Sequence, residues 1–79
     1  MSKLPGLKPR EVRKILLNAG FVEDTSKGSH RTYYHQKWDK HTTVSFHPGT
    51  IPQGTLRAIV NQTGLSLDEF LSYRKRKKK

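Results

Sequence analysis

The chain has 79 residues and no cysteine, so a single small hydrophobic core must hold its fold together. A domain of this size buries about 60% of the surface that its unfolded chain exposes, and its stability is correspondingly small. Without cysteine there is no disulfide, no thiolate metal site and no cysteine nucleophile. We therefore expect one domain over residues 1–73, followed by a disordered basic tail over residues 74–79.

The spacing of apolar residues predicts three helices. Residues 8–19 and 53–63 have helical spacing, and each segment is followed by a glycine suited to the left-handed conformation just past a helix end. Ser66 is followed three residues later by Glu69, which is the spacing of a capping box and predicts a short third helix.

Between the first two helices the sequence favours strands. Residues 30–36 and 41–47 are rich in Thr, Tyr, Val and Phe, which favour strands, and residues 21–25 form a shorter, weakly patterned strand candidate. The predicted strands therefore cover residues 21–25, 30–36 and 41–47. This order of elements predicts an α+β fold, in which a small three-stranded antiparallel sheet carries the helices on one face and leaves the other face open.

The second and third strands should form a hairpin, with the chain reversing between Trp38 and Asp39. The apolar face toward the helices then carries the opposed pairs Tyr33 with Val44 and Arg31 with Phe46. The polar face carries Thr32 with Ser45, Tyr34 with Thr43, and His30 with His47. Directly opposed residues have Cβ atoms about 4.5–5.5 Å apart, so the two imidazoles would both reach one phosphodiester.

Net charge narrows the class of partner. The formal charge is +10, with 16 Lys and Arg against 6 Asp and Glu, and the last six residues are all basic. Such a balance favours a polyanion, nucleic acid before an acidic membrane surface, because each phosphate contact releases a counterion. The sequence has no apolar stretch of signal-peptide or membrane-span length, so we expect a soluble cytoplasmic protein that does not enter a membrane.

The segment from Lys27 to Arg31 has the residue types needed to cleave RNA beside its 2′-hydroxyl. His30 can act as base or acid near neutral pH, with His47 as a second imidazole. Lys27 and Arg31 would supply positive charge and Ser29 a hydroxyl donor, and Gly28 would let the backbone approach a phosphate. The pattern alone leaves open that His30 is an ordinary solvated residue at the start of a strand.

Other residues receive simpler interpretations. The candidates for RNA contacts are Lys27, Arg31, Tyr34, Lys37 and Lys40. Tyr33 is expected in the core, and Trp38 at the turn either packs on a loop or contacts a partner. The basic residues of the predicted helices are expected on solvated helix faces, and the sequence leaves open which of them border the RNA. They are Lys8, Arg10, Arg13, Lys14 and Arg57.

A metal site is the main alternative chemistry for the histidines. It would use His30, His35, His41 and His47. We predict no metal and no other cofactor, because the expected register separates His35 and His41 from the face of the other two and no carboxylate completes a ligand set.

Over residues 4–71 the chain resembles the HicA toxin family of bacterial toxin–antitoxin pairs. The resemblance rests on LPGLKPREV, AGF, KGSHR, HPG and GTLRAIVNQTGLSLDEFL, in that order and spacing. It implies a fold like that of a double-stranded-RNA-binding domain and a metal-independent endoribonuclease that cleaves mRNA and so inhibits translation. It also implies a HicB-type antitoxin that covers the active face.

The family's essential histidine lies in a Gly-Ser-His motif, which matches Gly28, Ser29 and His30. His47 matches another recurring family position. The chain departs from the family where QKWDKH replaces the usual short Pro-Asp-Gly reversal, and its basic ending is heavier than expected. A double-stranded-RNA-binding module without catalysis remains the alternative function, because the same fold and charge would serve it.

Overall fold

The computed structural model describes residues 4–75, without the side chains of residues 25–27 and 75. Its elements in chain order are α1 (Pro9–Ala19), β1 (Val22–Lys27), β2 (His30–His35), β3 (Lys40–Ser45), α2 (Gln53–Thr63), α3 (Leu67–Ser72) and a 3₁₀ turn (Tyr73–Lys75). Both long helices agree with the predicted bounds. The predicted tail lies outside the described residues from residue 76 onward, while Arg74 and Lys75 lie in the 3₁₀ turn.

Local signals define the helix ends. The Glu11 carboxylate accepts a hydrogen bond from the Lys8 backbone N–H at 2.8 Å, which satisfies a free amide at the start of α1. α1 ends at Ala19 and is capped by Gly20, whose φ of 107° is unfavourable for any residue with a Cβ. Ser66 and Glu69 form the predicted capping box of α3, with bonds of 3.1 and 3.0 Å.

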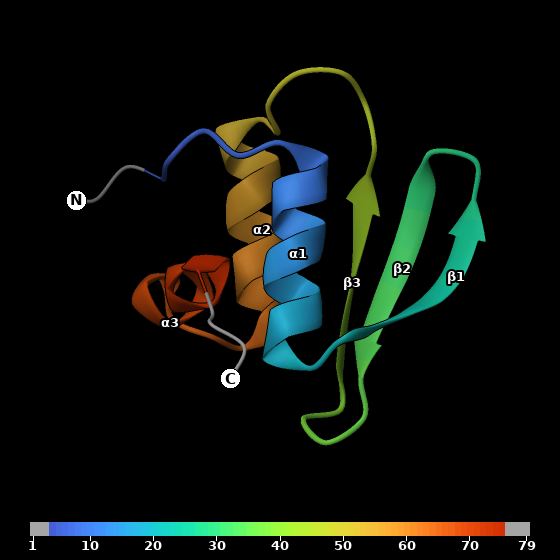
Figure 1. The fold of residues 1–79 in the computed structure, drawn as a ribbon, viewed down its shortest axis with the longest axis vertical. Coiled ribbons are helices and arrows are strands. Elements are labelled where there is room, and N and C mark those ends of the chain that lie inside the picture. Colours follow the sequence, from blue (N-terminus) through green and yellow to red (C-terminus); the bar gives the residue numbers. More distant parts are fainter. Residues whose placement is uncertain (1–3, 76–79) are drawn as a thin grey trace.

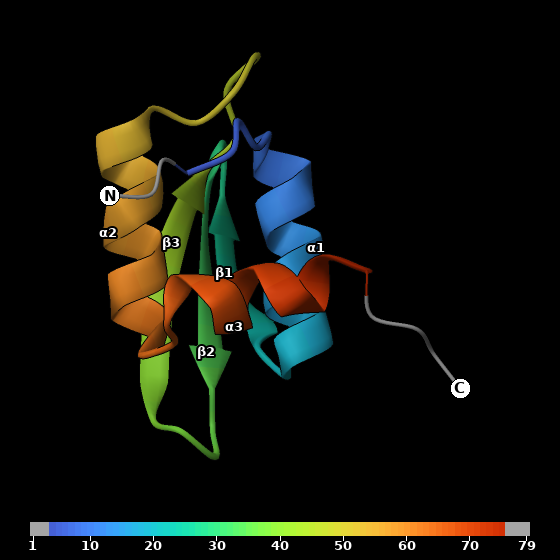
Figure 2. The same ribbon diagram turned by 90° about the vertical axis from the view of Figure 1, so that its left-hand side faces the viewer.

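The sheet is antiparallel with the strand order β1-β2-β3. Helices α1 and α2 lie side by side on one face of it, and in the described part of the chain no helix covers the other face (Figure 1). The short helix α3 crosses the outer side of α1 and α2 (Figure 2). The α+β fold with helices on one sheet face is therefore confirmed. Among residues 4–75, no helix has the length and apolarity needed to cross a bilayer.

One core lies between the sheet and the helices. Its fully buried side chains are led in size by Tyr33, Phe21 and Phe70, and include Leu7, Ile15, Leu16, Leu56, Val12 and Val44. Tyr33 is thus a core residue, as predicted, and its hydroxyl donates to Glu23 Oε1 at 3.1 Å. Because side chains alternate along a strand, His30, Thr32 and Tyr34 belong to the opposite, open face.

The predicted hairpin register is wrong by two residues. Tyr33 pairs with Thr42 and Arg31 with Val44, and His30 pairs with Ser45 rather than with His47. The reversal is therefore centred between Lys37 and Trp38, and β3 ends at Ser45, two residues earlier than expected. A slip of two residues keeps His30, Arg31 and Tyr33 on their predicted faces, because side-chain direction repeats every second residue.

Trp38 explains the difference in register. Its indole stacks on the His35 ring with 3.8 Å between ring centroids and meets Phe21 edge to face at 5.9 Å. Asp39 then takes a left-handed φ of 55°, a conformation that Asp tolerates better than most residues, and β3 begins at Lys40. Trp38 therefore stacks on the buried strand residue His35 rather than on a loop and also contacts the core residue Phe21, and the hairpin turns beside these contacts.

Candidate active site

The predicted catalytic histidines lie at one end of the sheet. His30 is the first residue of β2, and His47 follows the end of β3 by two residues. Because β2 and β3 are antiparallel, the start of one strand lies beside the end of the other. α1 and α2 both begin at this same end of the molecule (Figure 1).

The two imidazoles meet although their residues are not directly opposed. Their ring centroids are 6.3 Å apart and the rings are nearly perpendicular, at 89°. The Phe46 N–H donates to the Ser29 carbonyl at 2.6 Å, which extends the pairing of the two strands and holds His47 diagonally across from His30. Both side chains are exposed, so a ligand can approach either ring.

The turn before His30 is formed by Gly28 and Ser29. Gly28 has a φ of 59°, and no atom lies within 4 Å of a Cβ built on it, so the backbone there is open to a ligand. Ser29 is half-buried, and its carbonyl is occupied by the bond from Phe46. Lys27 pairs with His30 through the β1–β2 register, and its side chain lies outside the described part of the structure.

Arg31 does not share the face of His30. Its Nη1 lies 3.8 Å from Glu23 Oε1, and its guanidinium carbon lies 4.6 Å from the centroid of the Phe46 ring. The same carboxylate accepts the Tyr33 hydroxyl and lies 3.6 Å from Arg13 Nε. The Arg31 guanidinium therefore lies over Phe46, and part of its positive charge is balanced by Glu23.

Two other cations lie beside His47. A cleft of about 240 Å³ is lined by Lys8, Pro9, Arg10, Phe46, His47, Pro48 and Gly49. A second hollow of about 200 Å³ reaches from His47 toward the start of α2. The sequence placed Lys8 and Arg10 on a solvated helix face and left open which of the helical cations border the RNA. No local pattern could associate them with His47, because that contact depends on how α1 packs against the end of β3.

The remaining predicted RNA contacts lie farther from His30. Lys37 and Lys40 lie at the other end of β2, roughly 17 Å along the strand at the usual rise per residue. Tyr34 is on the open face, and its hydroxyl donates to Asp39 Oδ1 at 3.3 Å. Partial desolvation and the Asp39 carboxylate raise the pKa of Tyr34, so its hydroxyl stays protonated.

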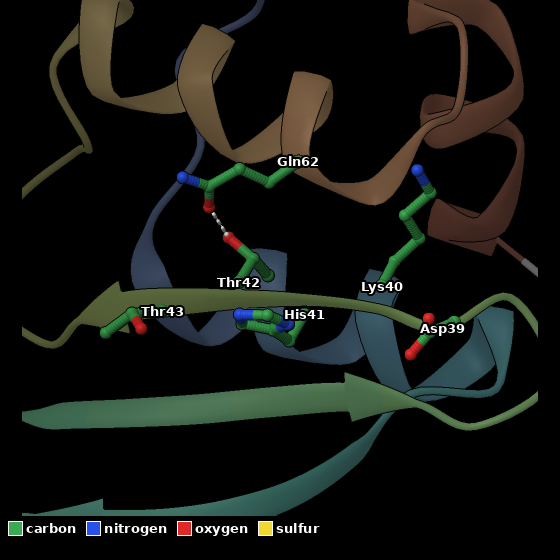
Figure 3. A pocket seen from close by; sticks show the side chains of 6 residues that line it. All are labelled: Asp39, Lys40, His41, Thr42, Thr43 and Gln62. Atoms are coloured by element: carbon green, nitrogen blue, oxygen red, sulfur yellow. Dashed lines mark hydrogen bonds between the residues drawn. The ribbon is translucent and has the colours of Figure 1, made fainter.

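The other two histidines have different surroundings. His35 is buried, with only 6% of its surface exposed. His41 pairs with Tyr34 and therefore shares the open face with His30, contrary to our expectation. It lines a separate cleft of about 490 Å³ beside α2, where Thr42 donates to Gln62 (Figure 3). Among the described residues, no three His, Asp or Glu side chains are grouped as metal ligands would be.

Comparison with known proteins places this arrangement in a family. No curated protein matches the chain. A family model described as the HicA toxin of bacterial toxin–antitoxin systems matches residues 9–65, which include both histidines of the site and every element from α1 to α2. The match covers more than half of the 79 residues, and the chain therefore belongs to the HicA toxin family.

Proposed function

We propose that this toxin is an endoribonuclease that cleaves mRNA and thereby inhibits translation, with His30 as a general acid or base and no catalytic metal. One observation carries the proposal: the exposed rings of His30 and His47 meet at 6.3 Å beside a cleft lined by cations. Two imidazoles at that separation can serve the two oxygens of one phosphodiester.

The reaction needs two proton transfers and no further reactant. One imidazole takes the proton of the ribose 2′-hydroxyl as that oxygen forms a bond to phosphorus. The other, as imidazolium, gives its proton to the 5′-oxygen as the bond from phosphorus to that oxygen breaks. The products are a 2′,3′-cyclic phosphate and a free 5′-hydroxyl. Lys27, three residues before His30 in the sequence, is the cation that would stabilise the negative phosphorane between these steps.

The open sheet face supplies a surface on which RNA could extend from the site. It carries His30, Thr32 and Tyr34 of β2, and Tyr34 can stack on an unpaired base. We propose that a HicB-type antitoxin inhibits the toxin by covering this face, since access to His30 would then be lost. We further propose a cytoplasmic protein with one domain over residues 1–73 and a basic tail over 74–79.

The test is cleavage of a defined RNA by purified protein in excess chelator. The wild-type chain should produce fragments with 2′,3′-cyclic ends, and His30→Ala should reduce the rate by about 10²–10⁴-fold, the usual contribution of one acid or base. His41→Ala is the matched control, because His41 is an exposed histidine on the same face but lines another cleft.

The outcomes separate the proposed functions. Equal cleavage by the wild-type chain and His30→Ala would reject the role of His30. If the folded wild-type chain binds RNA but produces no fragments, the binding module without catalysis is the better description. Cleavage that stops in chelator and returns with added metal would reject the metal-independent mechanism.

A further inference from the structure

We propose that Lys8, Arg10 and His47 form a subsite for the RNA phosphate next to the one that is cleaved. This inference rests on the nuclease function proposed above and adds a specific contact to it. The ligand class is a phosphodiester of single-stranded RNA, bound in the cleft of about 240 Å³ beside His47.

The charges of this cleft favour a phosphate. Lys8 and Arg10 both line it, both are exposed, and neither forms an ion pair with another described residue. The nearest carboxylate in sequence, Glu11, accepts the Lys8 backbone N–H. Besides His47, the remaining walls come from four residues that bring no negative charge: Pro9, Phe46, Pro48 and Gly49.

The position of the cleft relates it to the cleaved phosphate. His47 belongs to both places, since it lines the cleft and its ring lies 6.3 Å from that of His30. Successive phosphates of RNA are separated by a single ribose. An RNA strand with one phosphate between the imidazoles would therefore present its neighbouring phosphate to Lys8 and Arg10.

Other cations of the described chain are less suited to this role. Arg13 and Arg31 lie 3.6 and 3.8 Å from Glu23 Oε1 and are partly neutralised by it. Lys37 and Lys40 lie at the far end of β2. Lys14 on α1 and Arg57 on α2 are exposed and line neither of the two clefts described beside His47, which makes them matched controls of the same charge.

The experiment measures RNA affinity against salt in the full-length His30→Ala chain, so that the RNA stays intact. Two variants are made in this His30→Ala background. The first pair of substitutions is Lys8→Gln with Arg10→Gln, and the second pair is Lys14→Gln with Arg57→Gln. Each lost phosphate contact on a single strand should reduce the slope of log K against log salt by about 0.7. We expect this reduction for the first pair and an unchanged slope for the second, with equal urea midpoints for both.

Equal slopes for the two pairs would overturn the subsite, because the effect would then follow net charge alone. Lack of RNA binding by the His30→Ala chain would also overturn it. Cleavage by the chain with His30 intact tests the nuclease separately. Cleavage with equal slopes rejects the subsite alone, whereas a slope reduced only for the first pair without any cleavage rejects the nuclease and retains the phosphate site.

Discussion

At the residue scale, His35 and His30 show how position decides what a histidine does. The Trp38 N–H donates to Nδ1 of His35 at 3.1 Å, so Nε2 carries the proton and donates to the Ala19 carbonyl at 3.0 Å. Both ring nitrogens are occupied and the ring is buried, which makes His35 a structural residue. His30 and His47 are exposed and contact each other, so their nitrogens remain accessible to a substrate.

His47→Ala should change the pH dependence of cleavage as well as its rate. If His30 and His47 act as an acid and a base, kcat/KM of the wild-type chain follows a bell-shaped curve whose two limbs belong to the pair. The variant should lose one limb and about 10²–10⁴-fold in rate. The measurement is the initial rate of cleavage of one RNA over a range of pH. If the pH dependence of kcat/KM in His47→Ala keeps both limbs of the bell-shaped curve, His47 contributes to binding alone.

Gly20→Ala should be strongly destabilising. A Cβ at this position would lie 2.7 Å from His35 Nε2, and the φ of 107° is strained for any residue except glycine. We expect a loss of at least about 1–3 kcal/mol, the cost of such a backbone conformation, before the clash is added. The measurement is the urea midpoint at an unchanged m-value.

Gly28→Ala is the control for this prediction. Its φ of 59° is also left-handed, but nothing lies within 4 Å of the added Cβ. The difference in stability between the two variants combines the clash with His35 and the greater backbone strain at a φ of 107°. Equal losses would mean that the ring moves aside without cost.

At the element scale, the β2–β3 hairpin is determined by its loop. Trp38 turns back onto His35 and Phe21, and Asp39 takes the left-handed conformation before β3 begins. These contacts, rather than the alternation of the strands, select the register in which His30 faces Ser45. The alternation itself fits the observed register and the predicted one equally well.

The effect of an Asp39 substitution on stability should therefore depend on how readily the new residue adopts a left-handed φ of 55°. Asp39→Val should cost about 1–2 kcal/mol, because a β-branched residue is unfavourable at a φ of 55°. Asp39→Gly should stay within about 0.5 kcal/mol of the parent, since glycine adopts this φ freely and only the exposed Tyr34–Asp39 hydrogen bond is lost. Urea unfolding of the two variants checks the difference, and equal destabilisation would contradict the assigned turn.

At the scale of the whole molecule, Glu23 connects the sheet to α1. Its carboxylate accepts the Tyr33 hydroxyl of β2, and it pairs with Arg13 of α1 and Arg31 of β2. Burial, followed by the nearby charge of Glu23, raises the pKa of Tyr33 above the ordinary value of 10.0. The folded protein therefore retains this proton at a pH where the unfolded chain releases it.

Stability should consequently fall in alkaline solution. The contribution of Tyr33 is complete below pH 10.0, the ordinary tyrosine pKa, and decreases as pH rises above it, because ionisation then favours the unfolded chain. Tyr33→Phe should lose about 1 kcal/mol at pH 8 with its hydrogen bond. The difference in free energy of unfolding between this variant and the parent should become smaller above pH 10, because phenylalanine does not ionise. Urea unfolding between pH 8 and 11 tests this, and parallel curves would exclude Tyr33 as the cause.

The sequence alone was sufficient for the features that depend on near neighbours. Spacings of a few residues determine the bounds of α1 and α2, the Ser66 capping box, the glycines past the helix ends and the faces of the β2 residues. The Gly-Ser-His motif also points, by its resemblance to the family, to His30 as the residue proposed for catalysis. Each of these signals lies within one element, so local sterics and periodicity decide it.

Tertiary structure alone decided the rest. The hairpin register depends on Trp38 packing against Phe21, seventeen residues earlier in the chain, and on the backbone of Asp39. The position of Lys8 and Arg10 beside His47 depends on the start of α1 lying against the loop that follows β3. Contacts between distant segments arise from the packing of one core, and the spacing of residues along the chain does not determine them.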